Sequence, residues 1–103
     1  CIQFLPTLDG KVLFTVESLK TAKGELHPAQ AAMAVGHGSQ CGFCTPGFVM
    51  SLFALYKTRG APARSQIEDA LAGNLCRCTG YHNIVKSILA AAASMQGLRQ
   101  AAE

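Results

Sequence analysis

The chain has 103 residues, a mass of 10.8 kDa and a formal charge of +3, which fits one small domain. Half of its residues are hydrophobic and 15% are charged, so the composition excludes a largely disordered chain. No apolar run reaches the roughly 18 residues that a membrane-spanning helix needs. The Lys and Arg residues are scattered and Trp is absent, so we expect neither a membrane nor a nucleic acid as a partner.

The first 26 residues carry a pattern typical of β-strands. Two apolar, β-prone runs, at residues 1–5 and 12–16, flank the pair Asp9-Gly10, which is typical of tight turns. We therefore expect a short strand-like segment over residues 1–26. The first residue is Cys1 rather than Met, so we expect the chain to be a piece of a longer protein. No basic region followed by an apolar stretch suggests a signal peptide, and we expect a cytoplasmic location.

From Pro28 onward, the apolar residues follow helical spacing. The pattern predicts four helices, over residues 28–36, 46–59, 66–73 and 82–96. Thr45 is the expected N-cap of the second helix, and Ser65 with Glu68 is the expected capping box of the third. Residues 27–95 should thus form one helical domain, with residues 96–103 as a linker or tail.

Four of the five cysteines fall into two tight pairs, Cys41 with Cys44 and Cys76 with Cys78. Each pair stands before one of the longer helices, and each longer helix follows a shorter one. The two Cys-Thr steps, at Cys44 and Cys78, are 34 residues apart. This weak repeat predicts a mainly α fold, a four-helix bundle with pseudo-two-fold symmetry that brings the two cysteine loops together.

Four cysteines from two neighbouring loops can hold a structural zinc ion or a [2Fe–2S] cluster, or can form disulfides. The odd cysteine count argues against a closed disulfide framework. Zinc sites usually leave two to four residues between paired cysteines, whereas only Arg77 separates Cys76 from Cys78. Because two irons relax the demand that all four sulfurs surround one ion, the spacing favours [2Fe–2S] and leaves the other two possibilities open.

The residues around both cysteine pairs resemble the second, helical iron–sulfur domain of the molybdenum hydroxylase family. The resemblance is carried by residues 37–47 (HGSQCGFCTPG) and 73–81 (GNLCRCTGY). Residues 15–19 and 26–28 are also similar, and lean toward the small iron–sulfur and FAD subunit of the xanthine dehydrogenase branch. The similarity extends to about residue 92.

The resemblance implies specific roles for six residues. Cys41, Cys44, Cys76 and Cys78 would ligate a [2Fe–2S] cluster, and Gln40 and Cys78 would face the molybdopterin of a partner domain. Cys1 would be the last ligand of a second [2Fe–2S] cluster, in a plant-type ferredoxin domain whose other ligands lie upstream; residues 1–26 would be the end of that domain and a connector.

The same resemblance implies an electron-transfer domain that carries no catalytic residue of its own. Single electrons would pass from the molybdopterin centre through the clusters towards FAD and NAD. The implied partners are a molybdopterin-binding domain or subunit, an FAD-binding domain and the upstream ferredoxin domain, in a hetero-oligomer. The alternative function is a helical module for protein contacts, in which the four paired cysteines bind a structural zinc ion. Tyr81 is expected to pack over the second cysteine loop, and the three His residues to cap helices or lie at the surface.

Overall fold

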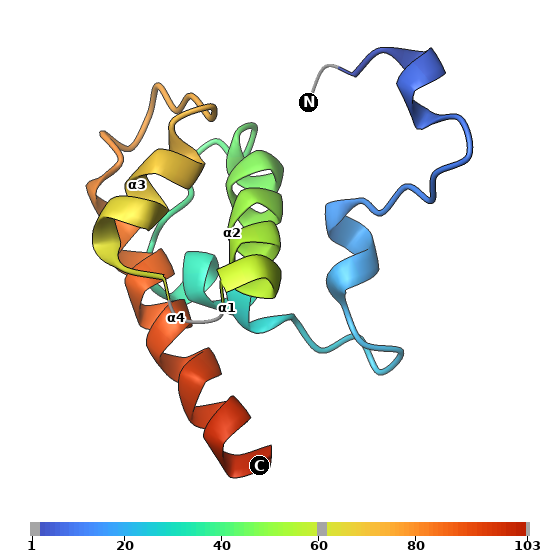
Figure 1. The fold of residues 1–103 in the computed structure, drawn as a ribbon. Helices are drawn as coiled ribbons and strands as arrows, with labels where there is room; N and C mark the ends of the chain where they lie inside the picture. Colours follow the sequence, from blue (N-terminus) through green and yellow to red (C-terminus); the bar gives the residue numbers. More distant parts are fainter. Residues whose placement is uncertain (1–2, 60–61, 103) are drawn as a thin grey trace.

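The structure is a computed structural model that describes residues 3–59 and 62–102, with side chains described as far as Met95. Cys1 therefore lies outside the described residues. Two 3-10 turns are followed by four α-helices (Figure 1): η1 Leu5–Leu8, η2 Val16–Leu19, α1 Pro28–Val35, α2 Thr45–Arg59, α3 Arg64–Leu71 and α4 His82–Ala102.

All four predicted helices are present, which confirms the mainly α fold. The helices α1 and α2 end within a residue of the prediction, whereas α3 begins earlier, at Arg64, and α4 continues to Ala102. The division into domains, including a tail at residues 96–103, stays a prediction.

Two predicted caps are wrong. Thr45 is the first residue of α2, and its hydroxyl lies 2.7 Å from that of Ser39. At α3, the earlier start makes Ala63 the N-cap, and its N–H donates to Gln66 Oε1 over 2.9 Å. Glu68 instead pairs with Arg64 at 2.8 Å. The capping role moved to Gln66 because the third helical position moved with the helix start.

The strand-like character expected at the N-terminus is also wrong for the described residues 3–26, which contain no strand. The Asp9-Gly10 turn does form: Lys11 N donates to Leu8 O over 3.0 Å, and Gly10 has a φ of +68°. Residues 12–15 that follow it are irregular and exposed. A β-strand needs a neighbour for its backbone hydrogen bonds, and no other part of the described chain supplies one.

The helices enclose one apolar core. Helix α1 packs against α4 and α2, while α3 packs against α2 and α4. The largest side chains that are buried almost completely come from all four helices: Met33, Phe48, Leu52, Ile67, Ile84, Ile88 and Met95. The pseudo-two-fold symmetry of the two helical halves stays a prediction.

The N-terminal segment lies along one side of this helical body (Figure 1). Its contact with this body involves η2: Val16 and Leu19 pack against the core, and Gln30 Nε2 donates to Val16 O over 3.0 Å. Within the described part of the chain, no helix is long and apolar enough to cross a membrane.

Candidate metal centre

The two cysteine loops meet at one end of the helical body. One loop joins α1 to α2 and carries Cys41 and Cys44; the other joins α3 to α4 and carries Cys76 and Cys78. The Sγ atoms of Cys41 and Cys78 lie 3.5 Å apart. The side chains of Cys44 and Cys76 are close enough for each to shift the pKa of the other. The sulfurs are therefore paired across the loops, and all four cysteines are free thiols rather than disulfides.

The first loop is held in place by the close approach of α1 to α4. A Cβ atom at Gly36 would collide with Ser87 Oγ of α4, and one at Gly38 would lie 2.8 Å from Met33 Sδ. Gly38 N donates to Met33 O over 2.9 Å, which closes the end of α1. Cys41 follows Gly38 by three residues, so the packing of α1 on α4 positions Cys41.

The turns within both loops depend on left-handed backbone. Gly42 has a φ of +84° and Gly80 of +67°, conformations that glycine adopts without steric cost. Cys44 directly precedes Thr45, the first residue of α2. Cys78 lies further from its helix, because residues 79–81 separate it from the start of α4.

The two sulfur pairs differ in burial. Cys76 is 8% exposed and Cys44 is partly buried, whereas Cys41 and Cys78 are exposed. Two apolar side chains stand out into solvent beside the loops, Phe43 at 94% and Leu75 at 82% exposure. One pair thus lies against the core and the other at the surface.

Each pair contains one thiol with a lowered pKa and one with a raised pKa. The side chain and then the backbone of Thr79 hydrogen-bond Cys76 and lower its pKa to about 7, while burial raises the pKa of Cys44. The backbone N–H of Phe43 lowers the pKa of Cys41, and the hydrogen bond with Cys41 raises the pKa of Cys78. In each pair, one thiol therefore loses its proton more readily than an isolated cysteine does.

The four sulfurs form two pairs, each with one cysteine from each loop. A tetrahedral zinc site needs four donors around one point, whereas a [2Fe–2S] cluster needs two thiolates on each of two irons.

A family described as a [2Fe-2S] binding domain matches residues 15–89, which include both cysteine loops. The chain belongs to this [2Fe-2S] binding domain family of the molybdenum hydroxylases. It is 52% identical over 86 residues to a xanthine dehydrogenase from Oryza sativa subsp. japonica and 51% identical over 85 residues to aldehyde oxidase 1 from Cavia porcellus. Each match covers 82% of this chain but 6% of the relative, so the chain spans a small part of these proteins.

Solved structures show the same fold. The aldehyde oxidoreductase from Desulfovibrio desulfuricans ATCC 27774 matches 81% of the chain with a TM-score of 0.74 and 41% identity, over 9% of its own length. Quinoline 2-oxidoreductase from Pseudomonas putida 86 matches 81% of the chain with a TM-score of 0.71 and 35% identity, over 52% of its matched chain. The relatives include both xanthine dehydrogenases and aldehyde oxidases, so the predicted xanthine dehydrogenase branch is not distinguished by them.

The remaining predicted site residues are placed as follows. Gln40 is exposed and directly precedes the exposed Cys41. Cys1 lies outside the described residues. Thr79 was not predicted as a site residue, yet its hydroxyl lies 3.1 Å from Cys76 Sγ. Tyr81 was expected to pack over the loop; in addition, its hydroxyl accepts the Cys76 N–H over 3.0 Å. In the sequence, the feature that points to Thr79 is its position, a hydroxyl residue directly after Cys78.

Proposed function

We propose that this chain is an electron-transfer domain of a molybdenum hydroxylase, in which Cys41, Cys44, Cys76 and Cys78 ligate one [2Fe–2S] cluster. The observation that carries the proposal is the pairing of sulfurs across the loops, supported by membership of the [2Fe-2S] binding domain family. One iron would be held by Cys41 and Cys78, and the other by Cys44 and Cys76. When bound, such a cluster takes up and releases one electron at a time.

The residues of this chain supply position and electrostatics for that chemistry. The packing of α1 on α4 fixes one loop, and the core residues under Cys76 fix the other. Because the Cys41 and Cys78 pair is exposed, electron exchange with a partner is expected at this side, where Gln40 is also exposed. We propose that Gln40 and Cys78 face the molybdopterin of a partner domain.

The wider assembly follows from the same proposal. The complete protein would be a xanthine dehydrogenase-like oxidoreductase that passes electrons from molybdopterin through two [2Fe–2S] clusters towards FAD and NAD. Cys1 would be the last ligand of the second cluster, in an upstream plant-type ferredoxin domain. The molybdopterin-binding and FAD-binding parts would complete a hetero-oligomer in the cytoplasm, and the two helical halves of this domain would be related by a pseudo-two-fold axis.

The [2Fe–2S] proposal and the zinc-binding alternative predict different metal contents. If the chain binds a [2Fe–2S] cluster, the protein purified without oxygen should contain about two irons and two acid-labile sulfides, and should give an electron paramagnetic resonance signal after reduction. Serine at any of the four proposed ligands should lower the iron content, whereas Cys1→Ser is the matched control and should leave this cluster intact. Zinc alone in the purified and reconstituted chain would contradict the proposal.

A further inference from the structure

In the second cysteine loop, hydrogen bonds link Cys76 to both Thr79 and Tyr81, and Tyr81 to Thr79. Thr79 Oγ1 lies 3.1 Å from Cys76 Sγ and accepts the Tyr81 N–H, also over 3.1 Å. We propose that the Thr79 hydroxyl donates a hydrogen bond to the Cys76 sulfur and thereby raises the reduction potential of the cluster. This inference rests on the proposed role of Cys76 as a ligand, and it makes Thr79 a positioning residue that acts through that ligand.

The direction of this hydrogen bond follows from the number of protons present. A hydroxyl has one hydrogen and two lone pairs, and the Tyr81 N–H occupies a lone pair of Thr79. A cysteine that ligates iron is a thiolate and has no proton to donate. The Thr79 hydrogen must therefore be the one that lies between the oxygen and the Cys76 sulfur.

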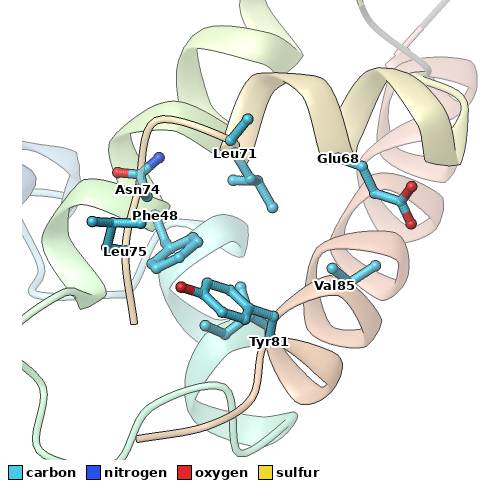
Figure 2. A pocket seen from close by; sticks show the side chains of 9 residues that line it. Phe48, Glu68, Leu71, Asn74, Leu75, Tyr81 and Val85 are labelled. Carbon is cyan, nitrogen blue, oxygen red and sulfur yellow. The ribbon is translucent and has the colours of Figure 1, made fainter. Parts of the chain in front are cut away.

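Tyr81 holds this arrangement in place. Its hydroxyl accepts the Cys76 N–H, and its ring packs edge-on against Phe48, with 6.3 Å between the ring centroids. Figure 2 shows the Tyr81 ring beside Phe48, with its hydroxyl on the side of Leu75, the residue before Cys76. Tyr81 reaches this position with a φ of +69°, which is unusual for a side chain of this size. The loop is thus tied to the core on both sides of Thr79.

Burial makes the Thr79 hydrogen bond effective. Cys76 is 8% exposed and Thr79 is partly buried, so water competes weakly for the sulfur. A hydrogen bond to a charged group is stronger where the local dielectric constant is low. Reduction adds a negative charge that the cluster sulfurs share, so a donor to Cys76 stabilises the reduced state more than the oxidised state.

The first cysteine loop provides a natural comparison. Thr45 directly follows Cys44, just as Thr79 directly follows Cys78. The Thr45 hydroxyl, however, pairs with the Ser39 hydroxyl at 2.7 Å rather than with a sulfur. The two threonines occupy equivalent places in the repeat, yet only Thr79 has a described contact with a sulfur.

The test compares threonine variants in the full-length protein that carries this domain. Thr79→Val keeps the shape of the side chain and removes the hydroxyl. It should lower the equilibrium constant for one-electron reduction of this cluster about tenfold, a fall in midpoint potential of about 59 mV. Thr79→Ser should restore the wild-type potential, and the matched control Thr45→Val should leave it unchanged. The cluster is identified as the one whose paramagnetic signal is lost in Cys76→Ser.

The other outcomes of this experiment would overturn either the inference about Thr79 or the proposed function. An unchanged potential in Thr79→Val, with iron and sulfide intact, would overturn it, as would an equal fall in Thr45→Val. If Thr79→Val assembles no cluster, Thr79→Ala replaces it, because this variant also lacks the hydroxyl and adds no bulk. Failure of both, with assembly in Thr79→Ser, would mean that the hydroxyl is needed for assembly rather than for the potential. A wild-type protein without this cluster would instead contradict the proposed function.

Discussion

The N-terminal segment, residues 3–26, and the helical region, residues 28–95, contain similar apolar residues but use them differently. In the helical region, side chains such as Ile67 and Ile88 are fully buried. In the N-terminal segment, several large apolar residues remain exposed, with Phe4 at 82% and Leu13 at 68%. The two regions meet at the start of α1. His27 and Gln30 cap this helix, and Gln30 also donates a hydrogen bond to Val16 of η2.

The difference shows what each pattern needs in order to bury its apolar side chains. An amphipathic helix makes its backbone hydrogen bonds within itself, so it needs only a packing surface. A strand-like run also needs a neighbouring strand, and the described chain contains none. The exposed N-terminal residues therefore agree with the proposal that an upstream domain completes this segment.

The largest expected difference between the two regions concerns apolar truncation. Ile88→Ala removes a fully buried side chain and should lower the free energy of unfolding by about 2–5 kcal/mol. Leu13→Ala is the matched control in the N-terminal segment and should change it by less than about 0.5 kcal/mol. Urea unfolding of the chain, followed by circular dichroism, measures both. Equal losses would show that the segment shares the core of the helical region.

A second difference concerns added volume. A Cβ atom at Gly36 would collide with Ser87 Oγ and lie 2.9 Å from Ala32 O, so Gly36→Ala should cost about 1–3 kcal/mol and lower Tm. Gly24, in the N-terminal segment, has open space but a φ of +82°. Gly24→Ala should strain only its own turn and lower Tm less than Gly36→Ala does. A Tm that falls equally in both variants would contradict this distinction.

The junction between the regions should respond to pH. Ala29 N donates to His27 Nδ1 over 3.2 Å, and burial, followed by the charge of Lys57, lowers the pKa of His27 below 6.5. The unfolded chain then binds more protons than the folded chain between the two pKa values, so stability should fall as the pH drops below about 6.5. Loss of this cap should cost about 1 kcal/mol.

Thermal unfolding at pH 5.5 and pH 7.5 tests the role of His27. His27→Asn keeps a capping acceptor that does not titrate, so its Tm should depend less on pH than that of the wild type. An equally steep dependence in this variant would assign the pH effect to another group.

The smallest expected effect concerns the link between Gln30 and η2. Gln30→Met removes the hydrogen bonds to Val16 O and from His27 N, and should destabilise the chain by about 0.5–1 kcal/mol. Hydrogen exchange at η2 should become faster while exchange in α4 stays the same. Gln66→Met is the matched control, because Gln66 caps α3 in the same way but has no described contact with the N-terminal segment. Equal acceleration in both variants would mean that Gln30 does not hold η2.

Prediction from the sequence succeeded where the signal is local. Helical spacing located all four helices, and Pro28 and the Asp9-Gly10 pair marked a helix start and a turn. It failed for Ser65 and Glu68, because α3 begins two residues earlier than predicted, which makes Ala63 the N-cap and Gln66 its capping partner. It also failed for residues 12–15, because a strand pattern does not say whether a partner strand is present.

The candidate site was predicted in its members but not in its geometry. The spacing of Cys41, Cys44, Cys76 and Cys78 predicts a shared site, because cysteines this close in two loops are typical of metal ligands. The roles of Thr79 and Tyr81 depend on hydrogen bonds between side chains and backbone, which no periodic pattern reveals.

By itself, the sequence determined the four helices, the cysteine-bearing loops and the family, because each depends on short-range spacing of residue types. The tertiary structure alone decided that Cys41 lies against Cys78 and Cys44 near Cys76, and that the second pair is less exposed than the first. Such pairings depend on the packing of α1 on α4 and of α3 on α2, contacts between residues far apart in the chain. Distances across a core arise from the sum of many such contacts, so they become defined only when the whole chain is folded.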